Sequence, residues 1–328
     1  MKKRVVVYKE LPPAQLARLT ERFEVTCFDG VNAATREAFL AALRSAHGII
    51  GASAKIDAEV LAGAEQLEIA STISVGYDAF DIPAMRARGI MLTHTPDILT
   101  DSVADLVFAL ILGVSRRVVE LDGFVRSGKW GKSVEDEAFG VDVHHRTIGL
   151  IGMGRIAAAV ARRAHLGFGM KVIYDDHKRV PAVEAEFGAV SMPVADVLAQ
   201  ADYVCPLLPY RPENDKLFGA AEFARMKPTA IFINASRGKV VDEAALIAAL
   251  ESRTIRGAGL DVFESEPLSV DSPLVGMANV VLLPHIGSAT AATREGMVEM
   301  AVDDLIAGLE GQRPPHLVDA AMWSAGRA

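Results

Sequence analysis

The sequence predicts an α/β protein with two doubly wound parallel sheets, each covered by helices on both faces. Short β-branched or apolar runs alternate with segments of helical periodicity from the N-terminus to about residue 99, and again from residue 147 to about residue 283. Such alternation is typical of βαβ units, whose strands are parallel. With 328 residues the chain is too long for one ordinary core, so we expect two domains.

The first alternation supplies an N-terminal domain that covers residues 1–99. Its expected strands are 5–8, 25–28, 48–51, 67–71 and 90–92, and its expected helices are 14–23, 35–44, 59–62 and 82–88. The first of these helices starts behind Pro12-Pro13, which suits the first turn of a helix. A last helical segment, 293–309, is expected to return to this domain, so that 290–328 completes it.

Residues 100–289 are expected to form the second domain. It opens with a long apolar-rich helical stretch at 102–127 and a polar segment at 128–145 without periodicity. Strands are then expected at 147–151, 171–174, 230–233, 257–260 and 280–283. Because the carboxyl ends of parallel strands meet at one edge of a sheet, the residues that follow these strands are the candidates for a ligand site.

Composition and charge limit the classes of partner. The chain is 51% hydrophobic and 23% charged, as globular proteins are, and its net charge of −8 argues against binding to nucleic acid or an anionic membrane. Cys27 and Cys205 fit neither a disulfide framework nor a zinc motif, and no metal site is expected. The N-terminal apolar run is too short for a signal peptide. We therefore expect a cytoplasmic protein that binds small molecules.

A glycine-rich motif follows the strand expected at 147–151. It reads Gly152-Met153-Gly154-Arg155-Ile156-Ala157 and enters a helical segment. In dinucleotide-binding domains the first glycine permits a tight turn and the second lets the backbone approach the pyrophosphate; the small Ala157 suits the third position, where helix and strand pack closely. The helix N-terminus then offers N–H groups to the phosphates. An ordinary tight turn is the alternative interpretation.

Two acidic residues after the next strand bear on the choice of cofactor. Asp176, with Asp175 as second choice, stands about 20 residues beyond the glycines, where a carboxylate accepts hydrogen bonds from the adenine ribose and repels a 2′-phosphate. This favours NAD(H). Lys178 and Arg179 leave NADP(H) possible, because a basic side chain could hold a 2′-phosphate. A solvated turn would explain the same residues without a ligand.

Three side chains that can bind an anion or exchange a proton follow the last three expected strands. Arg237 can pair with a carboxylate through its planar guanidinium and polarise a carbonyl. His285 can exchange a proton near neutral pH, and Glu266 can orient that imidazole and favour its charged form. Together they predict hydride-transfer chemistry on a ketone beside a carboxylate. Singly, they could be a surface charge, a capping acid and a strand-end histidine.

Further motifs make the chain recognisable. They are Ser71-Thr72-Ile73-Ser74-Val75-Gly76-Tyr77-Asp78, Asp142-Val143-His144-His145, Gly152-Met153-Gly154-Arg155-Ile156, Ile233-Asn234-Ala235-Ser236-Arg237-Gly238, Leu260-Asp261-Val262-Phe263, Leu268-Ser269-Val270-Asp271-Ser272-Pro273-Leu274 and Pro284-His285-Ile286-Gly287-Ser288-Ala289-Thr290. With them the chain resembles the D-isomer-specific 2-hydroxyacid dehydrogenases along nearly its full length. It looks most like their bacterial glyoxylate/hydroxypyruvate/2-ketogluconate reductases.

The resemblance implies two Rossmann-like domains with an active-site cleft between them, and a homodimer built largely on the nucleotide-binding domain. It implies that the backbone N–H groups of Val75 and Gly76 bind the substrate carboxylate and that Asp261 holds the nicotinamide amide. Arg237, Glu266 and His285 keep the roles given above. The cofactor contacts expected are Gly152, Gly154, Arg155, Ile156, Asp175, Asp176, Cys205, Asp261 and Gly287.

Two positions depart from the family pattern. Relatives that prefer NADPH carry a basic residue just after the second strand, where this chain has Asp175-Asp176-His177, so that preference does not carry over. Relatives often place a tryptophan near the substrate where this chain has Glu137-Ala138-Phe139, so the size of the substrate could differ.

The predicted function is NAD(P)H-dependent reduction of small 2-oxoacids to D-2-hydroxyacids, with glyoxylate, hydroxypyruvate or 2-ketogluconate as substrate. Two alternatives stay open. One is a sibling dehydrogenase that acts on phosphoglycerate, phosphite or formate. The other is a non-catalytic NAD-sensing scaffold like the corepressors that share this fold.

Overall fold

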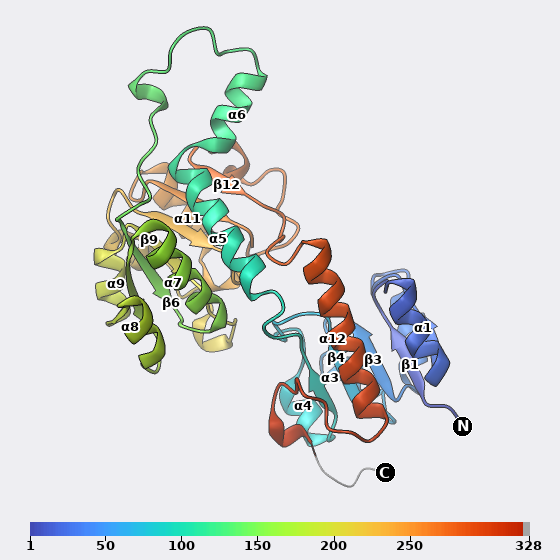
Figure 1. Cartoon of the computed structure of the whole chain (residues 1–328). Coiled ribbons are helices and arrows are strands. Elements are labelled where there is room, and N and C mark those ends of the chain that lie inside the picture. The colour runs from blue at the N-terminus through green and yellow to red at the C-terminus, as the bar shows by residue number, and fades with distance from the viewer. Residues whose placement is uncertain (324–328) are drawn as a thin grey trace. The chain divides into compact units, whose positions relative to one another are not determined.

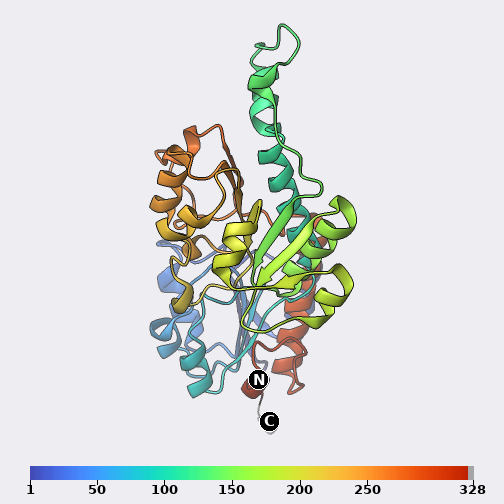
Figure 2. The same cartoon turned by 90° about the vertical axis from the view of Figure 1, so that its left-hand side faces the viewer.

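The computed structural model describes residues 1–323 and divides into two compact units, each built on one parallel sheet. Unit 1 consists of residues 1–99 together with the chain from residue 289 onward, and unit 2 consists of Thr100–Ser288. Figures 1 and 2 show both units coloured along the chain. The predicted fold class, an α/β protein with two doubly wound parallel sheets, is confirmed. Within the expected C-terminal segment 290–328, residues 324–328 lie outside the described part.

Unit 1 contains a five-stranded sheet in the order β2-β1-β3-β4-β5. Its strands are β1 (Arg4–Val7), β2 (Glu24–Cys27), β3 (Gly48–Gly51), β4 (Ile69–Thr72) and β5 (Met91–Thr93). Strands β3 and β4 are buried along their whole length, as expected for inner strands of a parallel sheet that is covered on both faces.

Helices cover both faces of this sheet. On one face α12 (Ala291–Leu309) packs on β3, β4 and β5 and contacts α1 (Pro13–Arg22). The other face carries α2 (Arg36–Leu43), α3 (Ala58–Ala62) and α4 (Ile82–Ala87), whose apolar residues share one core with the strands. A 3₁₀ helix at Ala320–Met322 follows. The hydroxyl of Ser71 on β4 donates to the carbonyl of Ala301 on α12 at 2.8 Å, so the C-terminal helix is part of the core of unit 1.

Unit 2 contains a seven-stranded sheet in the order β12-β11-β10-β9-β6-β7-β8. Its strands are β6 (Thr147–Ile151), β7 (Lys171–Asp175), β8 (Val190–Ser191), β9 (Tyr203–Pro206), β10 (Ile231–Asn234), β11 (Gly257–Leu260) and β12 (Val280–Leu282). The strand order reverses between β6 and β9, which is the position where open parallel sheets bind dinucleotides.

Two layers of helices enclose the sheet of unit 2. Helices α5 (Thr100–Ser115), α7 (Arg155–Phe168) and α8 (Pro181–Phe187) share one core. Helices α9 (Val194–Gln200), α10 (Ala220–Arg225) and α11 (Glu243–Glu251) share the core on the opposite face. Short 3₁₀ helices lie at Asp136–Ala138, Pro212–Asn214, Gly238–Val240 and Pro273–Gly276.

The helical stretch expected at 102–127 is two helices. Helix α5 ends at Ser115, and α6 (Val118–Arg126) begins after Arg117, whose φ is +56°. The cause lies in the returning chain: Val141 donates its N–H to the carbonyl of Ser115 at 2.8 Å, and a Cβ at Gly140 would lie 2.4 Å from that carbonyl oxygen. The carbonyl of Ser115, the last of α5, is thus bound by another segment, and the helix stops there.

Helix α6 and the segment up to residue 140 extend away from the sheet of unit 2 in both views (Figures 1 and 2). No helix within residues 1–323 combines the length and the apolar character needed to cross a membrane.

Candidate functional site

The loops that follow β6, β7, β10, β11 and β12 lie at one edge of the sheet in unit 2, because its strands are all parallel. All candidate residues of this unit except Cys205 stand in these loops or at the strand ends and helix start beside them. The site is therefore described loop by loop, starting with the glycine-rich turn after β6.

The two glycines of this turn have different surroundings. Gly152 has φ +89°, and a Cβ there would lie 2.9 Å from the carbonyl oxygen of Leu207, so no other residue fits without strain. Gly154, the residue before α7, has open space where a Cβ would be, and Arg155 and Ile156 form the first turn of α7. Ala157 is fully buried, as the packing position of the motif requires.

The Asp176 carboxylate is tied to the glycine-rich turn. Its Oδ2 accepts a hydrogen bond from the N–H of Met153 at 2.6 Å, and its Oδ1 accepts one from the N–H of Lys178 at 3.3 Å. Only 15% of the Asp176 side chain is exposed. The pKa of neighbouring Asp175 is raised by burial and by the charge of Asp176. Asp175 contacts the turn only through its backbone carbonyl, which accepts the N–H of Gly152 at 2.8 Å, so of the two carboxylates that of Asp176 is the one bound to the turn.

The basic residue Arg179 is engaged by Glu184. Its Nε donates to Oε1 of Glu184 at 3.0 Å, and its second contact reaches the other oxygen of the same carboxylate. The hydroxyl of Tyr174 donates to this carboxylate at 2.7 Å and accepts the N–H of Val180 at 2.8 Å. Arg179 is thus hydrogen-bonded to Glu184 of α8, although most of its side chain is exposed.

Cys205 differs from the other expected cofactor contacts. It lies within β9, it is fully buried, and its side chain packs in the core shared with α5 and α7. Burial raises the pKa of its thiol. Because the residue has no exposed surface, a ligand cannot touch it in this conformation, and Cys205 serves packing here.

His285 and Glu266 are hydrogen-bonded, with His285 Nδ1 2.7 Å from Glu266 Oε2. The other oxygen of Glu266 accepts the N–H of Phe263 at 3.1 Å. Burial alone would raise the pKa of Glu266, but the hydrogen bonds from His285 and Phe263 and the charges of His285 and Arg237 together hold it below its ordinary value. The carboxylate is therefore ionised at neutral pH and faces the imidazole.

Asp261 organises the loop that carries His285. Its carboxylate accepts the N–H groups of Ile286 at 2.7 Å and Gly287 at 2.9 Å, and its carbonyl accepts the N–H of His285 at 2.9 Å. His285 has φ +55°, a conformation that a non-glycine residue adopts only when its surroundings enforce it. Asp261 is almost completely buried, and this burial raises its pKa. Both carboxylate oxygens thus serve the 285–287 loop.

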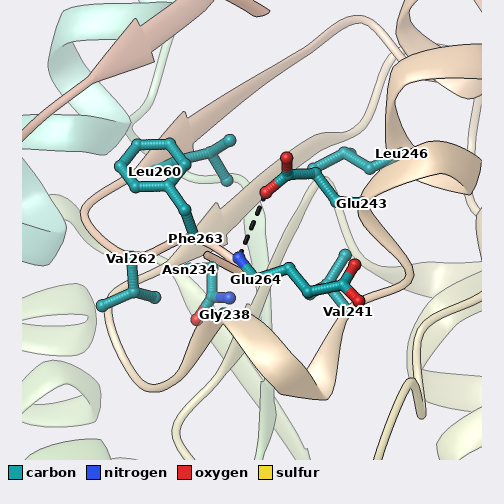
Figure 3. A pocket seen from close by; sticks show the side chains of 9 residues that line it. All are labelled: Asn234, Gly238, Val241, Glu243, Leu246, Leu260, Val262, Phe263 and Glu264. Atoms are coloured by element: carbon teal, nitrogen blue, oxygen red, sulfur yellow. Dashed lines mark hydrogen bonds between the residues drawn. The ribbon is translucent and has the colours of Figure 1, made fainter. Parts of the chain in front are cut away.

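Gly238 brings the loop of Arg237 against the loop of Glu266. A Cβ at Gly238 would lie 1.8 Å from backbone atoms of Phe263, so only glycine permits this approach. Figure 3 shows the contact from close by, with Glu243 of α11 accepting the N–H of Glu264 at 3.1 Å. The cavity that Gly238, Glu243 and Glu264 help to line measures about 10 Å³, which is room for no more than a water molecule. It is a packing feature and not a substrate site.

Gly238 stands in the sequence motif of Arg237 without a role of its own, and Glu243 is absent from the candidate residues. A glycine directly after a catalytic candidate is a signal for close backbone approach and could have been used. No pattern distinguishes Glu243 from any other acid in the first turn of a helix. Arg237 itself is half-buried, and its Nη1 donates to the carbonyl of Ser236 at 2.8 Å.

Val75 and Gly76 lie in unit 1, in the loop that follows β4. The carbonyl of Ser74 accepts the N–H of Thr95 at 3.0 Å, and the carbonyl of Gly76 accepts the hydroxyl of Ser74 at 2.7 Å. Within residues 1–323 neither the N–H of Val75 nor that of Gly76 donates a hydrogen bond. Two adjacent backbone donors are therefore available to a ligand at the carboxyl edge of this sheet.

Comparison with known proteins assigns the family. The sequence model described as D-isomer specific 2-hydroxyacid dehydrogenase, NAD binding domain, matches residues 108–287. Glyoxylate/hydroxypyruvate reductase B of Escherichia fergusonii is 51% identical over 319 residues, which cover 97% of this chain and 98% of that protein. This chain belongs to the D-isomer-specific 2-hydroxyacid dehydrogenases. The matched residues are the NAD-binding domain of this dehydrogenase and lie within unit 2.

Solved structures agree with this assignment. A protein of Thermus thermophilus is 42% identical with a TM-score of 0.88, and the match covers 96% of this chain and all of that one. An NADPH-dependent glyoxylate/hydroxypyruvate reductase of Sinorhizobium meliloti, solved with NADP and malonate, is 33% identical with a TM-score of 0.87 and full coverage of both chains. These matches confirm the family that the sequence motifs predicted for this chain.

Proposed function

We propose that this dehydrogenase reduces small 2-oxoacids, with glyoxylate and hydroxypyruvate as its substrates and 2-ketogluconate as a further candidate, to D-2-hydroxyacids. The observation that carries the proposal is the 2.7 Å pair of His285 and Glu266, electrostatically coupled to Arg237, in a chain with the family's NAD-binding domain. Relatives about half identical to it are named glyoxylate/hydroxypyruvate reductase B.

Each catalytic side chain has one task in this reaction. When bound, reduced nicotinamide supplies a hydride for the carbonyl carbon. Arg237 pairs with the substrate carboxylate and polarises the carbonyl oxygen. His285 gives a proton to that oxygen and becomes neutral, while Glu266 stabilises the charged imidazole before the transfer and fixes its orientation. The N–H groups of Val75 and Gly76 bind the carboxylate as well.

We infer a preference for NADH over NADPH from the loop after β7. Asp176 stands against the glycine-rich turn, where a 2′-phosphate would be repelled by its carboxylate. Arg179, the basic residue best able to offset that repulsion, is bound by Glu184. The residues of the turn fit a dinucleotide, because Gly152 permits the tight turn and Gly154 leaves open space in front of α7.

The test of this function is steady-state kinetics with NADH and NADPH, each against glyoxylate, hydroxypyruvate and 2-ketogluconate. We expect turnover of at least one 2-oxoacid and a higher kcat/KM with NADH. An NADPH preference above about tenfold, which corresponds to about 1.4 kcal/mol, would contradict the role given to Asp176. Dinucleotide binding with neither oxidation of NADH by the 2-oxoacids nor reduction of NAD+ by phosphoglycerate, phosphite or formate would favour the corepressor-like scaffold. Activity on one of these alone would favour the sibling dehydrogenases.

We also propose that the dehydrogenase is a homodimer. Large apolar side chains are exposed on α6 and the segment that follows it, including Val119 at 59%, Trp130 at 61% and Phe139 at 61%. Exposed apolar side chains concentrated on one projecting segment indicate a surface that another chain covers. A second copy of this chain is the partner that the family resemblance implies.

We further place this activity in the cytoplasm. The support is the unpaired state of both cysteines, Cys27 exposed and Cys205 buried, which suits a reducing compartment.

A further inference from the structure

The loop that carries Val75 and Gly76 is fastened to unit 1 through its carbonyl groups. The carbonyl of Ser74 accepts the N–H of Thr95 at 3.0 Å, and the carbonyl of Val75 lies 3.0 Å from Nδ1 of His94. The hydroxyl of Ser74 donates to the carbonyl of Gly76 at 2.7 Å. Three consecutive carbonyls are thus bound from within the unit, and one of the partners is an ionisable side chain that the reaction itself does not use.

The direction of each N–H group follows from these carbonyl contacts. A peptide unit is planar and trans, so its C=O and N–H point in opposite directions. The carbonyl of Val75 and the N–H of Gly76 belong to one such unit, and the carbonyl of Ser74 and the N–H of Val75 belong to the preceding one. The contact with His94 therefore aims the N–H of Gly76 away from His94, and the contact with Thr95 does the same for the N–H of Val75.

The tautomer of His94 follows from the same contact. A carbonyl oxygen only accepts hydrogen bonds, so Nδ1 of His94 must carry the proton that it shares with Val75. The interaction is present in both the neutral Nδ1–H tautomer and the charged imidazolium. His94 thus acts as a fixed donor to the loop.

His94 is itself held in place. Its backbone N–H donates to the carbonyl of His316 at 3.1 Å, and its ring meets the ring of Tyr77 edge-on, with centroids 5.6 Å apart. The ring of His316 is in turn bound to the fully buried carboxylate of Asp304 at 3.1 Å. The backbone of His94 is therefore tied to the C-terminal segment of unit 1, and its ring lies against Tyr77 and the carbonyl of Val75.

We propose that His94 is a positioning residue that aims the N–H of Gly76 and thereby sets the affinity of the enzyme for the carboxylate of its 2-oxoacid. The inference rests on the proposed role of Val75 and Gly76. It adds a specific reason for the histidine after β5: without the contact at Nδ1 the peptide unit between residues 75 and 76 loses the bond that fixes its carbonyl, and with it the direction of the Gly76 N–H.

The test compares His94→Leu, which removes the donor, with His94→Asn, whose amide N–H can stand in the place of Nδ1–H. We expect His94→Leu to raise KM for glyoxylate, and the inhibition constant of malonate, by about tenfold, the usual effect of one lost hydrogen bond. We expect kcat and KM for NADH to change little. His94→Asn should restore most of the loss.

His47→Leu is the matched control in the same unit. The ring of His47 accepts the N–H of Arg4 at 3.1 Å and has no contact with the 74–76 loop. We expect it to lower the melting temperature without changing either carboxylate constant. Equal melting temperatures for the two His94 variants, measured alongside, would show that the difference between them is not one of folding.

The outcomes separate this inference from the function on which it rests. Normal glyoxylate KM and malonate inhibition in His94→Leu, in an otherwise active enzyme, would overturn the role of His94 and leave the proposed function standing. Failure of His94→Asn to recover affinity would also overturn it. Absence of 2-oxoacid turnover in the wild-type enzyme would instead contradict the proposed function.

Discussion

His285, the proposed proton donor, stands in a conformation that its surroundings impose. His285 has a left-handed backbone, and the buried carboxylate of Asp261 accepts the next two N–H groups. Backbone strain of this kind persists where the surrounding structure over-determines it, and it is common at functional sites. Asp261 was expected to contact the nicotinamide amide, yet both of its oxygens are occupied by the loop. At this residue the structure thus shows a positioning role, and the cofactor contact stays a prediction.

The pairing of Glu266 with His285 predicts a pH dependence of stability. The pKa of Glu266 is lowered in the folded protein. The pair therefore contributes stability above the carboxylate's ordinary pKa of about 4.3, and the contribution is lost as the pH falls through the lower folded value. Melting temperatures of the wild-type enzyme and Glu266→Gln should differ at pH 7 and converge in acid.

The difference should be small, because both side chains are more than one third exposed. If the melting temperatures of the wild-type enzyme and Glu266→Gln differed by the same amount at pH 7 and in acid, the assignment of the lowered pKa to this pair would be wrong.

At the scale of elements, the break between α5 and α6 separates a buried helix from an exposed one. Helix α5 is largely buried against the sheet of unit 2, whereas none of the residues of α6 is buried. The periodicity of the sequence continues across both helices, so a break there was not visible from the pattern. The break depends on Gly140 and Val141, which are distant in the sequence and approach Ser115 only in the folded chain.

The exposed segment predicts a dependence of assembly on its apolar side chains. We expect the wild-type enzyme to sediment as a dimer and the double variant Trp130→Glu with Phe139→Glu to sediment as a monomer, because charges on a covered apolar surface oppose association. Since both side chains are 61% exposed, the monomer should keep its far-UV circular dichroism. A monomeric wild-type enzyme, or a double variant that stays dimeric, would contradict the proposal that this segment forms the dimer interface.

At the scale of the whole molecule, the pattern of the sequence was sufficient for the fold class and the family. Strand and helix alternation is local, and motifs such as Gly152-Met153-Gly154 carry their own structural reason. Contacts between distant loops were not predictable in this way. The packing of β10, β11 and α11 determines two of these contacts: the close approach of Gly238 to Phe263 and the hydrogen bond from the N–H of Glu264 to Glu243. Cys205 illustrates the same limit, because no strand was expected around it and its burial within β9 depends on the packing of the whole unit.

The central claim is that His285, held by Glu266, moves the proton for reduction of a 2-oxoacid. Its most direct test is turnover of glyoxylate with NADH by the wild-type enzyme and by His285→Gln. We predict that the variant loses about 10²- to 10⁴-fold in kcat, the usual contribution of a general acid, while its affinity for NADH is unchanged. A kcat within about threefold of the wild-type value, well below that range, would contradict the account.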